Sequence, residues 1–240
     1  MKRFLLIALL FASASLAQDR VIWIRKAAGG GGGGGAVTFD AFTESGNLSN
    51  TTSCSVTHST ANQPNRVMLI LLAWDSADTN ASSVTVDGSA ATSVRSDGGY
   101  FSNKRTAIWR YVAPAVGSNS VSVTWSTSGG AKKCVAVTAY NVNQSAPVAD
   151  SKGNGTGAGE NNVSYSIATP ANGMAFDILM LNQNNDDGPW TPGAGQTQYV
   201  QTVRWSESRV QCSRTTGTSL SWTIVGANKL WSYSAVALSP

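Results

Sequence analysis

The chain has 240 residues, of which only 12% are charged, and its formal net charge is +4 with a single histidine. So few charges exclude surface helices that are held together by ion pairs. They favour strands with small polar residues on one face and apolar residues on the other. No cluster of Lys or Arg is present that could follow a phosphate backbone, so we expect no nucleic-acid partner.

Residues 1–17 have the pattern of a secretory signal peptide. Lys2 and Arg3 precede the apolar run Phe4 to Ala12, and Ser15-Leu16-Ala17 is a small-x-small cleavage site. The apolar run is shorter than the ~20 residues that span a bilayer, so we expect no membrane insertion of the mature chain. We therefore predict a secreted, extracellular protein whose mature net charge is about +2 once Lys2 and Arg3 are removed.

Residues 18–35 form an N-terminal extension with two parts. Val21, Ile22, Trp23 and Ile24 are strand-forming and apolar, and Gly29 to Gly35 are seven consecutive glycines. Such an apolar strip is costly to expose to water. The glycines, fully extended, span at most about 25 Å, and they lack the Lys-Ser/Thr that follows a phosphate-binding loop. We interpret the extension as a tethered strand that completes a sheet edge of a neighbouring copy. The alternatives are that the strip folds back on its own sandwich or is a frayed tail.

Short alternating runs, separated by Gly, Asn, Asp and Pro, follow from residue 36 to the C-terminus. Turn signals at intervals of about 8–12 residues are typical of an all-β sandwich. The sequence predicts an antiparallel, jelly-roll-like β-sandwich with strands at 36–43, 53–59, 66–74, 83–88, 91–96, 105–112, 120–126, 133–141, 162–168, 173–181, 196–203, 208–213, 220–225 and 230–238.

The two halves of this body resemble each other in pattern. The run SVTHSTANQPNRVMLILL aligns without a gap with NVSYSIATPANGMAFDIL at an offset of 107, and CVAVTAY aligns with YSAVALS at an offset of 99. Each half would then supply a similar set of strands. We predict one sandwich domain over 36–240. The alternative is two small sandwiches at 36–149 and 163–240, with the Gly-rich segment 150–162 as the hinge between them.

Several short motifs occur in an order that resembles a known module. They are the strand start Asn65-Arg66, the turn Trp109-x-Tyr111-x-x-Pro114-x-x-Gly117 and the loop Val142-x-Gln144-x-x-Pro147. Together with the closing WSYSAVALS, they are similar to a β-sandwich module of exported bacterial proteins and phage virion proteins, over residues 50 to 239. The resemblance implies a jelly-roll-type fold with an adhesive or structural role, and it implies no catalytic residues.

Three cysteines lie far apart in the chain. Export permits a disulfide, but an odd number leaves at least one thiol unpaired in a monomer. Cys54 alternates in phase with Val56, and Cys212 in phase with Val210, so Cys54 and Cys212 are the candidate pair. The alternative is that all three, with Cys134, are small buried residues.

Residues able to carry out catalysis are few. His58 is the only histidine and lies in the middle of a predicted strand, where a hydrogen-bonded structural role is favoured over that of a base. Asp177 interrupts the apolar run MAFDILML; it is either a buried, paired charge or, as we favour, a residue on the outward face. Carboxylates are present, but nothing in their spacing selects a glycosidase pair. We therefore predict no catalytic residue and no enzyme.

Two further features concern ligands. Trp74 and Trp190 lie at loop edges beside polar residues, where exposed rings stack on sugars in sandwich modules. Asp186 and Asp187 lie in an oxygen-rich loop that is a weak calcium candidate; it fails the EF-hand pattern, and a solvated turn is favoured. We predict no metal and no cofactor.

These observations predict a secreted structural subunit that self-associates into an extracellular filament or surface layer by donation of its N-terminal strand. Its partners would then be copies of itself. The alternative is a carbohydrate- or surface-binding, adhesin-like module with glycans or cell surfaces as partners. An extracellular hydrolase is the least favoured of the three functions.

Overall fold

The computed structural model describes residues 35–98, 103–156, 162–182, 190–202, 208–223 and 230–240. These residues fold into antiparallel strands joined by turns, which confirms the predicted all-β sandwich class. No helix long and apolar enough to cross a bilayer occurs in this part of the chain.

The N-terminal half, residues 38–140, forms two sheets. Sheet A has the strand order β1-β10-β4-β8-β7, with β2 added to β10, and sheet B has the order β3-β9-β5-β6. The strands are β1 (Thr38–Glu44), β2 (Leu48–Ser49), β3 (Ser53–Thr60), β4 (Val67–Asp75), β5 (Ser83–Val86), β6 (Ser89–Ala90), β7 (Thr92–Gly98), β8 (Lys104–Val112), β9 (Gly117–Thr124) and β10 (Ala131–Tyr140).

The C-terminal half, residues 148–238, repeats this arrangement. Sheet C has the order β11-β18-β13-β16-β15 and sheet D the order β12-β17-β14. The strands are β11 (Val148–Thr156), β12 (Asn162–Ser166), β13 (Met174–Asn182), β14 (Thr191–Pro192), β15 (Thr197–Gln201), β16 (Ser208–Thr215), β17 (Ser219–Thr223) and β18 (Trp231–Leu238).

The strand registers of the two halves agree with the offsets in the sequence. Cys134 of β10 lies opposite Leu72 of β4, and Tyr233 of β18 lies opposite Leu179 of β13. The two leucines are 107 residues apart, and Cys134 and Tyr233 are 99 apart. Each half also carries an aspartate near the start of its first strand that accepts a backbone N–H just beyond the matching strand β3 or β12. Asp40 accepts from Ala61 at 3.0 Å, and Asp150 accepts from Ala168 at 2.8 Å. The two halves are therefore equivalent in topology and in local contacts.

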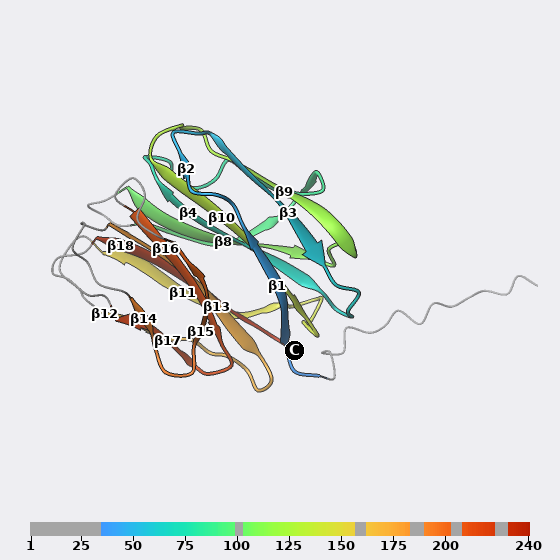
Figure 1. Ribbon diagram of the computed structural model, residues 1–240. Helices are drawn as coiled ribbons and strands as arrows, with labels where there is room; N and C mark the ends of the chain where they lie inside the picture. The colour runs from blue at the N-terminus through green and yellow to red at the C-terminus, as the bar shows by residue number, and fades with distance from the viewer. Residues whose placement is uncertain (1–34, 99–102, 157–161, 183–189, 203–207, 224–229) are drawn as a thin grey trace, which may run out of the picture.

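The four sheets are stacked in the order B, A, C and D, and an apolar core fills each of the three spaces between them (Figure 1). This stacking explains the two continuous apolar runs of the sequence. In β4, Leu69 and Leu71 face sheet C while Ile70 and Leu72 face sheet B. Because both faces of β4 are covered, eight of its nine residues are buried. The same holds for β13 of sheet C, whose two faces are covered by sheets A and D.

The contact between sheets A and C differs along its two margins. At the β7–β18 margin small polar groups meet: Ser234 Oγ donates to Asp97 Oδ2 at 2.5 Å, and Thr106 Oγ1 lies 2.8 Å from Ser234 Oγ. At the β1–β15 margin aromatic rings fill the space, with the Phe39 and Tyr199 centroids 5.7 Å apart. The sheets approach more closely at the first margin because its side chains are small.

Fourteen predicted strands correspond to observed ones with ends displaced by a few residues, and β11 is the main departure. The two-domain alternative places a hinge at 150–162, but residues 150–156 belong to β11 and pair with β18. Gly153 is needed there: a Cβ on it would meet Asp97 Oδ2 and the Tyr233 carbonyl oxygen, each at 2.4 Å. This Gly-rich segment therefore forms a strand in close contact with Asp97 and Tyr233.

Candidate functional site

The two tryptophans predicted to stack on sugars are buried, so this prediction is wrong. Trp74 is 0% exposed, and its indole N–H donates to the backbone oxygen of Asp78 at 3.0 Å. Trp190 is 3% exposed and belongs to the core between sheets C and D. Both rings are covered because they lie between two sheets, Trp74 between sheets A and B and Trp190 between sheets C and D.

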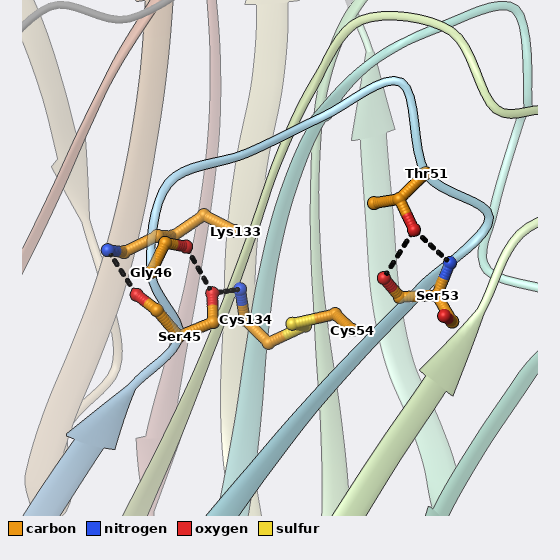
Figure 2. The surroundings of a disulfide bond; sticks show 7 residues. All are labelled: Ser45, Gly46, Thr51, Ser53, Cys54, Lys133 and Cys134. Carbon is orange, nitrogen blue, oxygen red and sulfur yellow. Dashed lines mark hydrogen bonds between the residues drawn. A yellow bond between two sulfur atoms is a disulfide. The ribbon is translucent and has the colours of Figure 1, made fainter.

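The predicted disulfide between Cys54 and Cys212 is also wrong. Cys54 of β3 is bonded to Cys134 of β10, with Cα atoms 6.4 Å apart, and Cys212 is a buried free thiol (Figure 2). Cys54 and Cys134 face the core between sheets A and B, whereas Cys212 faces the core between sheets A and C. Sheet A separates the two cores, so Cys54 and Cys212 cannot meet.

The remaining predicted site residues lie outside the described part of the chain. They are the strip Val21, Ile22, Trp23 and Ile24, and the weak calcium candidates Asp186 and Asp187. Within the described ranges, no group of three or more His, Cys, Asp or Glu side chains is placed to hold a metal ion.

Asp177 is buried, contrary to the outward placement that the sequence favoured. Its carboxylate is 0% exposed and accepts four hydrogen bonds. The donors are the Ser213 N–H at 2.7 Å, Ser213 Oγ at 2.8 Å, Trp222 Nε1 at 2.8 Å and the Tyr233 hydroxyl at 3.3 Å. Burial raises the pKa of Asp177 to about 6, and the hydrogen bonds oppose that rise. The carboxylate ties sheet C to sheet D and is enclosed by the core, which does not suit a group that must reach a substrate.

His58 has a structural role, as predicted. It is 0% exposed, with Nε2 2.6 Å from Thr138 Oγ1 and Nδ1 2.9 Å from Thr43 Oγ1. Burial lowers its pKa, and the charge of Asp40 opposes this shift. Both ring nitrogens are hydrogen-bonded between sheets A and B, so the imidazole has a structural role.

Asp78 organises the loops at one end of the N-terminal half. Its carboxylate accepts hydrogen bonds from the hydroxyls of Ser76, Ser126 and Thr127 and from the Thr127 N–H at 3.0 Å. Burial acts to raise the pKa of Asp78, but these hydrogen bonds outweigh it and the pKa is lowered. These hydrogen bonds join the Asp78 carboxylate to its own loops. They fix the Asp78 backbone, whose oxygen accepts from the Trp74 indole, and so hold Trp74 in the core.

The sheet edges differ in how far they are protected against pairing with another chain. Sheets A and C have a register irregularity in each edge strand longer than two residues: β1, β7, β11 and β15. The edge strands β2, β6 and β14 have two residues each. Bulges and very short edge strands are devices that prevent edge-to-edge association. Among the described edge strands longer than two residues, only β3 and β12 have a continuous register.

β3 is the longer of these two strands, with eight residues against five. It pairs with β9 alone among the described strands, and it contains no proline, no acidic residue and no Lys or Arg. Its exposed side chains are the small hydroxyls of Ser53, Ser55, Thr57 and Ser59, which alternate with buried residues. A long, regular edge without charges is a ready template for strand addition. We regard the β3 edge as the candidate interface.

A shallow pocket of about 360 Å³ lies in the C-terminal half, beside the contact between Asp150 and Ala168. It is lined by Asp150, Lys152, Ser166, Ile167, Ala168 and Thr218. Burial acts to raise the pKa of Asp150, but hydrogen bonds from Ala168, Lys152 and Ser151 lower it. The repeated aspartate–alanine contact assigns Asp150 a structural role, so the pocket has one exposed lysine and a few polar groups to offer a ligand.

Comparisons with protein-family models, with curated proteins and with solved structures give no significant match.

Proposed function

We propose that this chain is a secreted structural subunit that self-associates into a filament or surface layer. In this proposal the apolar strip Val21–Ile24 of one copy adds to the β3 edge of the next. The observation that carries the proposal is the contrast between β3 and the protected edges of sheets A and C. The tethered apolar strip supplies a strand that needs a partner, and β3 is an edge suited to receive it.

The strand chemistry of the strip suits such pairing. In an extended strand Ile22 and Ile24 lie on one face, and Val21 and Trp23 lie on the other. Pairing with β3 would lay one of these pairs along the margin of the core between sheets A and B. The backbone of the strip would gain ladder hydrogen bonds at the same time.

The tether favours a neighbouring copy over the same chain. The described chain starts beside the loop that follows β3: the Asn141 side chain donates to the Ala36 oxygen, and the Asn141 N–H donates to the Pro64 oxygen. A strip tethered there would run parallel to β3 of its own chain, whereas every ladder described is antiparallel. Antiparallel pairing within the chain would require residues 27–35 to extend almost fully, over about 30 Å. A second copy removes this constraint.

The proposal is tested by deleting residues 18–28 and examining the secreted protein by negative-stain electron microscopy. We expect assemblies of the mature chain and monomers of the deletion variant.

The acceptor is tested with S55K/T57K, which places two lysines on the edge strand β3. The matched control S120K/S122K places two lysines on the same face, but on the interior strand β9, where both residues are exposed. Assembly that survives the deletion would rule out strand donation.

A further inference from the structure

Lys133 of β10 has unusual neighbours for a lysine. Its side chain is 4% exposed, and its Nζ lies 2.8 Å from Glu44 Oε2 and 3.3 Å from Asn47 Oδ1. Nζ also donates to the backbone oxygen of Ser45 at 2.6 Å (Figure 2). A buried amine, a side-chain amide and a carboxylate therefore meet at one point.

The fold fixes this meeting point from both sides. β1 pairs with β10 as far as Glu44, which lies opposite Val135, and β2 pairs with β10 through Leu48, which lies opposite Lys132. The short connection at residues 45–47 must therefore pass beside Lys133. Ser45 is fixed there, because its N–H donates to the Cys134 oxygen at 2.9 Å and its Oγ accepts from the Cys134 N–H at 3.2 Å.

From this geometry we propose that Lys133 and Asn47 form an intramolecular amide bond, with Glu44 as the proton carrier. Glu44 takes a proton from the Nζ of Lys133, with which it forms an ion pair, and the amine so formed attacks Cγ of Asn47. A new Nζ–Cγ bond forms, Glu44 passes its proton to the amide nitrogen, and the bond from Cγ to that nitrogen breaks. The second proton that Nζ loses is carried by Glu44 to the departing ammonia, which leaves as ammonium. The step consumes one amine and one primary amide and needs no oxidant, reductant or metal.

The arrangement meets the physical requirements of the step. The connection between β1 and β2 places Asn47 Oδ1 3.3 Å from Lys133 Nζ, so the reaction of the two groups is effectively unimolecular. Lys133 has little freedom to leave because it is almost fully covered, while the Glu44 side chain is 39% exposed. Ammonia can therefore escape to solvent, and its loss makes the bond irreversible in dilute solution.

The bond would complement the neighbouring disulfide. Cys134 faces sheet B and closes a loop of 80 residues with Cys54. Lys133 lies between Ala131 and Val135, which face sheet C, and its bond would join residues 86 apart. Two consecutive residues of β10 would then fix the start of the N-terminal half covalently from both faces of sheet A.

The test is intact-mass and tandem mass spectrometry of the full chain. We expect a mass lower by one ammonia than the sequence with one disulfide requires, and a branched peptide that joins Asn47 to Lys133. The variants K133M, N47A and E44Q should each lose the ammonia deficit. The matched control K152M should keep it, because Lys152 also lies beside a carboxylate, 3.3 Å from Asp150 Oδ1, but has no amide partner of this kind.

The Cys54–Cys134 disulfide, detected in the same digest, shows that each variant has folded. A wild-type chain with full mass, in which trypsin cleaves after Lys133 and Asn47 is intact or deamidated, would overturn the proposal. A branched peptide at full yield in folded E44Q would overturn the role of Glu44. The outcome does not depend on self-association, so it is independent of the function proposed above.

Discussion

The N-terminal and C-terminal halves share one strand order but tie their sheets together by different chemistry. In the N-terminal half, Cys134 of sheet A is bonded to Cys54 of sheet B. At the matching position of the C-terminal half, Tyr233 stacks on Tyr165 with centroids 5.0 Å apart and donates to Asp177. Asp177 in turn accepts from Trp222 of sheet D. A covalent bond in one half corresponds to aromatic stacking and a buried carboxylate in the other.

The difference shows what the shared topology requires and what it leaves open. In both halves, two facing sheets are linked through an inward-pointing residue of the last strand, Cys134 of β10 or Tyr233 of β18. The topology fixes that position but not the chemistry that fills it. A disulfide is indifferent to pH, whereas a buried carboxylate is not, so the two halves should differ in their response to solution conditions.

The largest expected effect comes from removing the indole in the C-terminal half. Trp222 is 0% exposed, so W222A should lower the free energy of unfolding by about 3–5 kcal/mol, because it leaves a cavity and removes a donor from Asp177. V123A, 99 residues earlier on β9, should cost about 1–3 kcal/mol. Urea unfolding measures both. Equal losses would show that the indole has no special role.

Removing the disulfide tests the corresponding link in the N-terminal half. C54A/C134A should lower the free energy of unfolding by about 2–5 kcal/mol, because the unfolded chain loses a closed loop. The effect should not change between pH 4 and pH 7. C212A is the control, since Cys212 is a buried free thiol and its loss leaves the disulfide in place. A C54A/C134A loss no larger than that of C212A would contradict this account.

Asp177 of the C-terminal half and His58 of the N-terminal half should give pH responses of opposite sign. The pKa of Asp177 rises from 3.8 to about 6 on folding, so its contribution is complete below pH 3.8 and is lost as the pH rises through 6. D177N should remove this dependence, which amounts to about 3 kcal/mol. The pKa of His58 falls below 6.5 on folding, so its contribution is lost as the pH falls. Chemical denaturation at pH 4, 5, 6 and 7 separates the two, and a D177N profile parallel to wild type would contradict the assignment.

The smallest effect concerns the margin where the halves meet. G153A should lower the free energy of unfolding by about 1–3 kcal/mol, because its Cβ would press on Asp97 and on the backbone of Tyr233. G129A is the matched control: a Cβ there meets nothing within 4 Å, so we expect a change within about 0.5 kcal/mol. Thermal unfolding distinguishes them, and equal melting temperatures would contradict the close approach.

Local pattern was sufficient to predict the strand class and most of the strands, because alternation and turn residues act over a few residues. It failed at β11, where Gly153 and its polar neighbours have the composition of a linker although contact with another sheet makes them a strand. It also failed for the cysteine pair. Alternation shows that Cys54, Cys134 and Cys212 point inward, but not which of three cores each one enters. The period of the sequence shows which residues share one face of a strand. Which faces meet depends on how the four sheets are stacked.

The burial of Trp74, Trp190 and Asp177 has the same cause. A residue at a loop edge or within an apolar run is exposed or buried according to what covers it, and here the outer sheets B and D cover these three residues. The cluster of Lys133, Glu44 and Asn47 escaped sequence reasoning because Lys133 is 86 residues from Asn47. Only the pairing of β1 and β2 with the same strand brings them together.

The most direct test of strand donation is the binding of a synthetic peptide of residues 18–28 to the chain that lacks them, followed by the fluorescence of Trp23 and by calorimetry. We predict saturable binding with one peptide per chain, abolished in S55K/T57K and retained in S120K/S122K. Absence of binding, or binding that both lysine pairs leave unchanged, would contradict the proposed role of β3 as the acceptor edge.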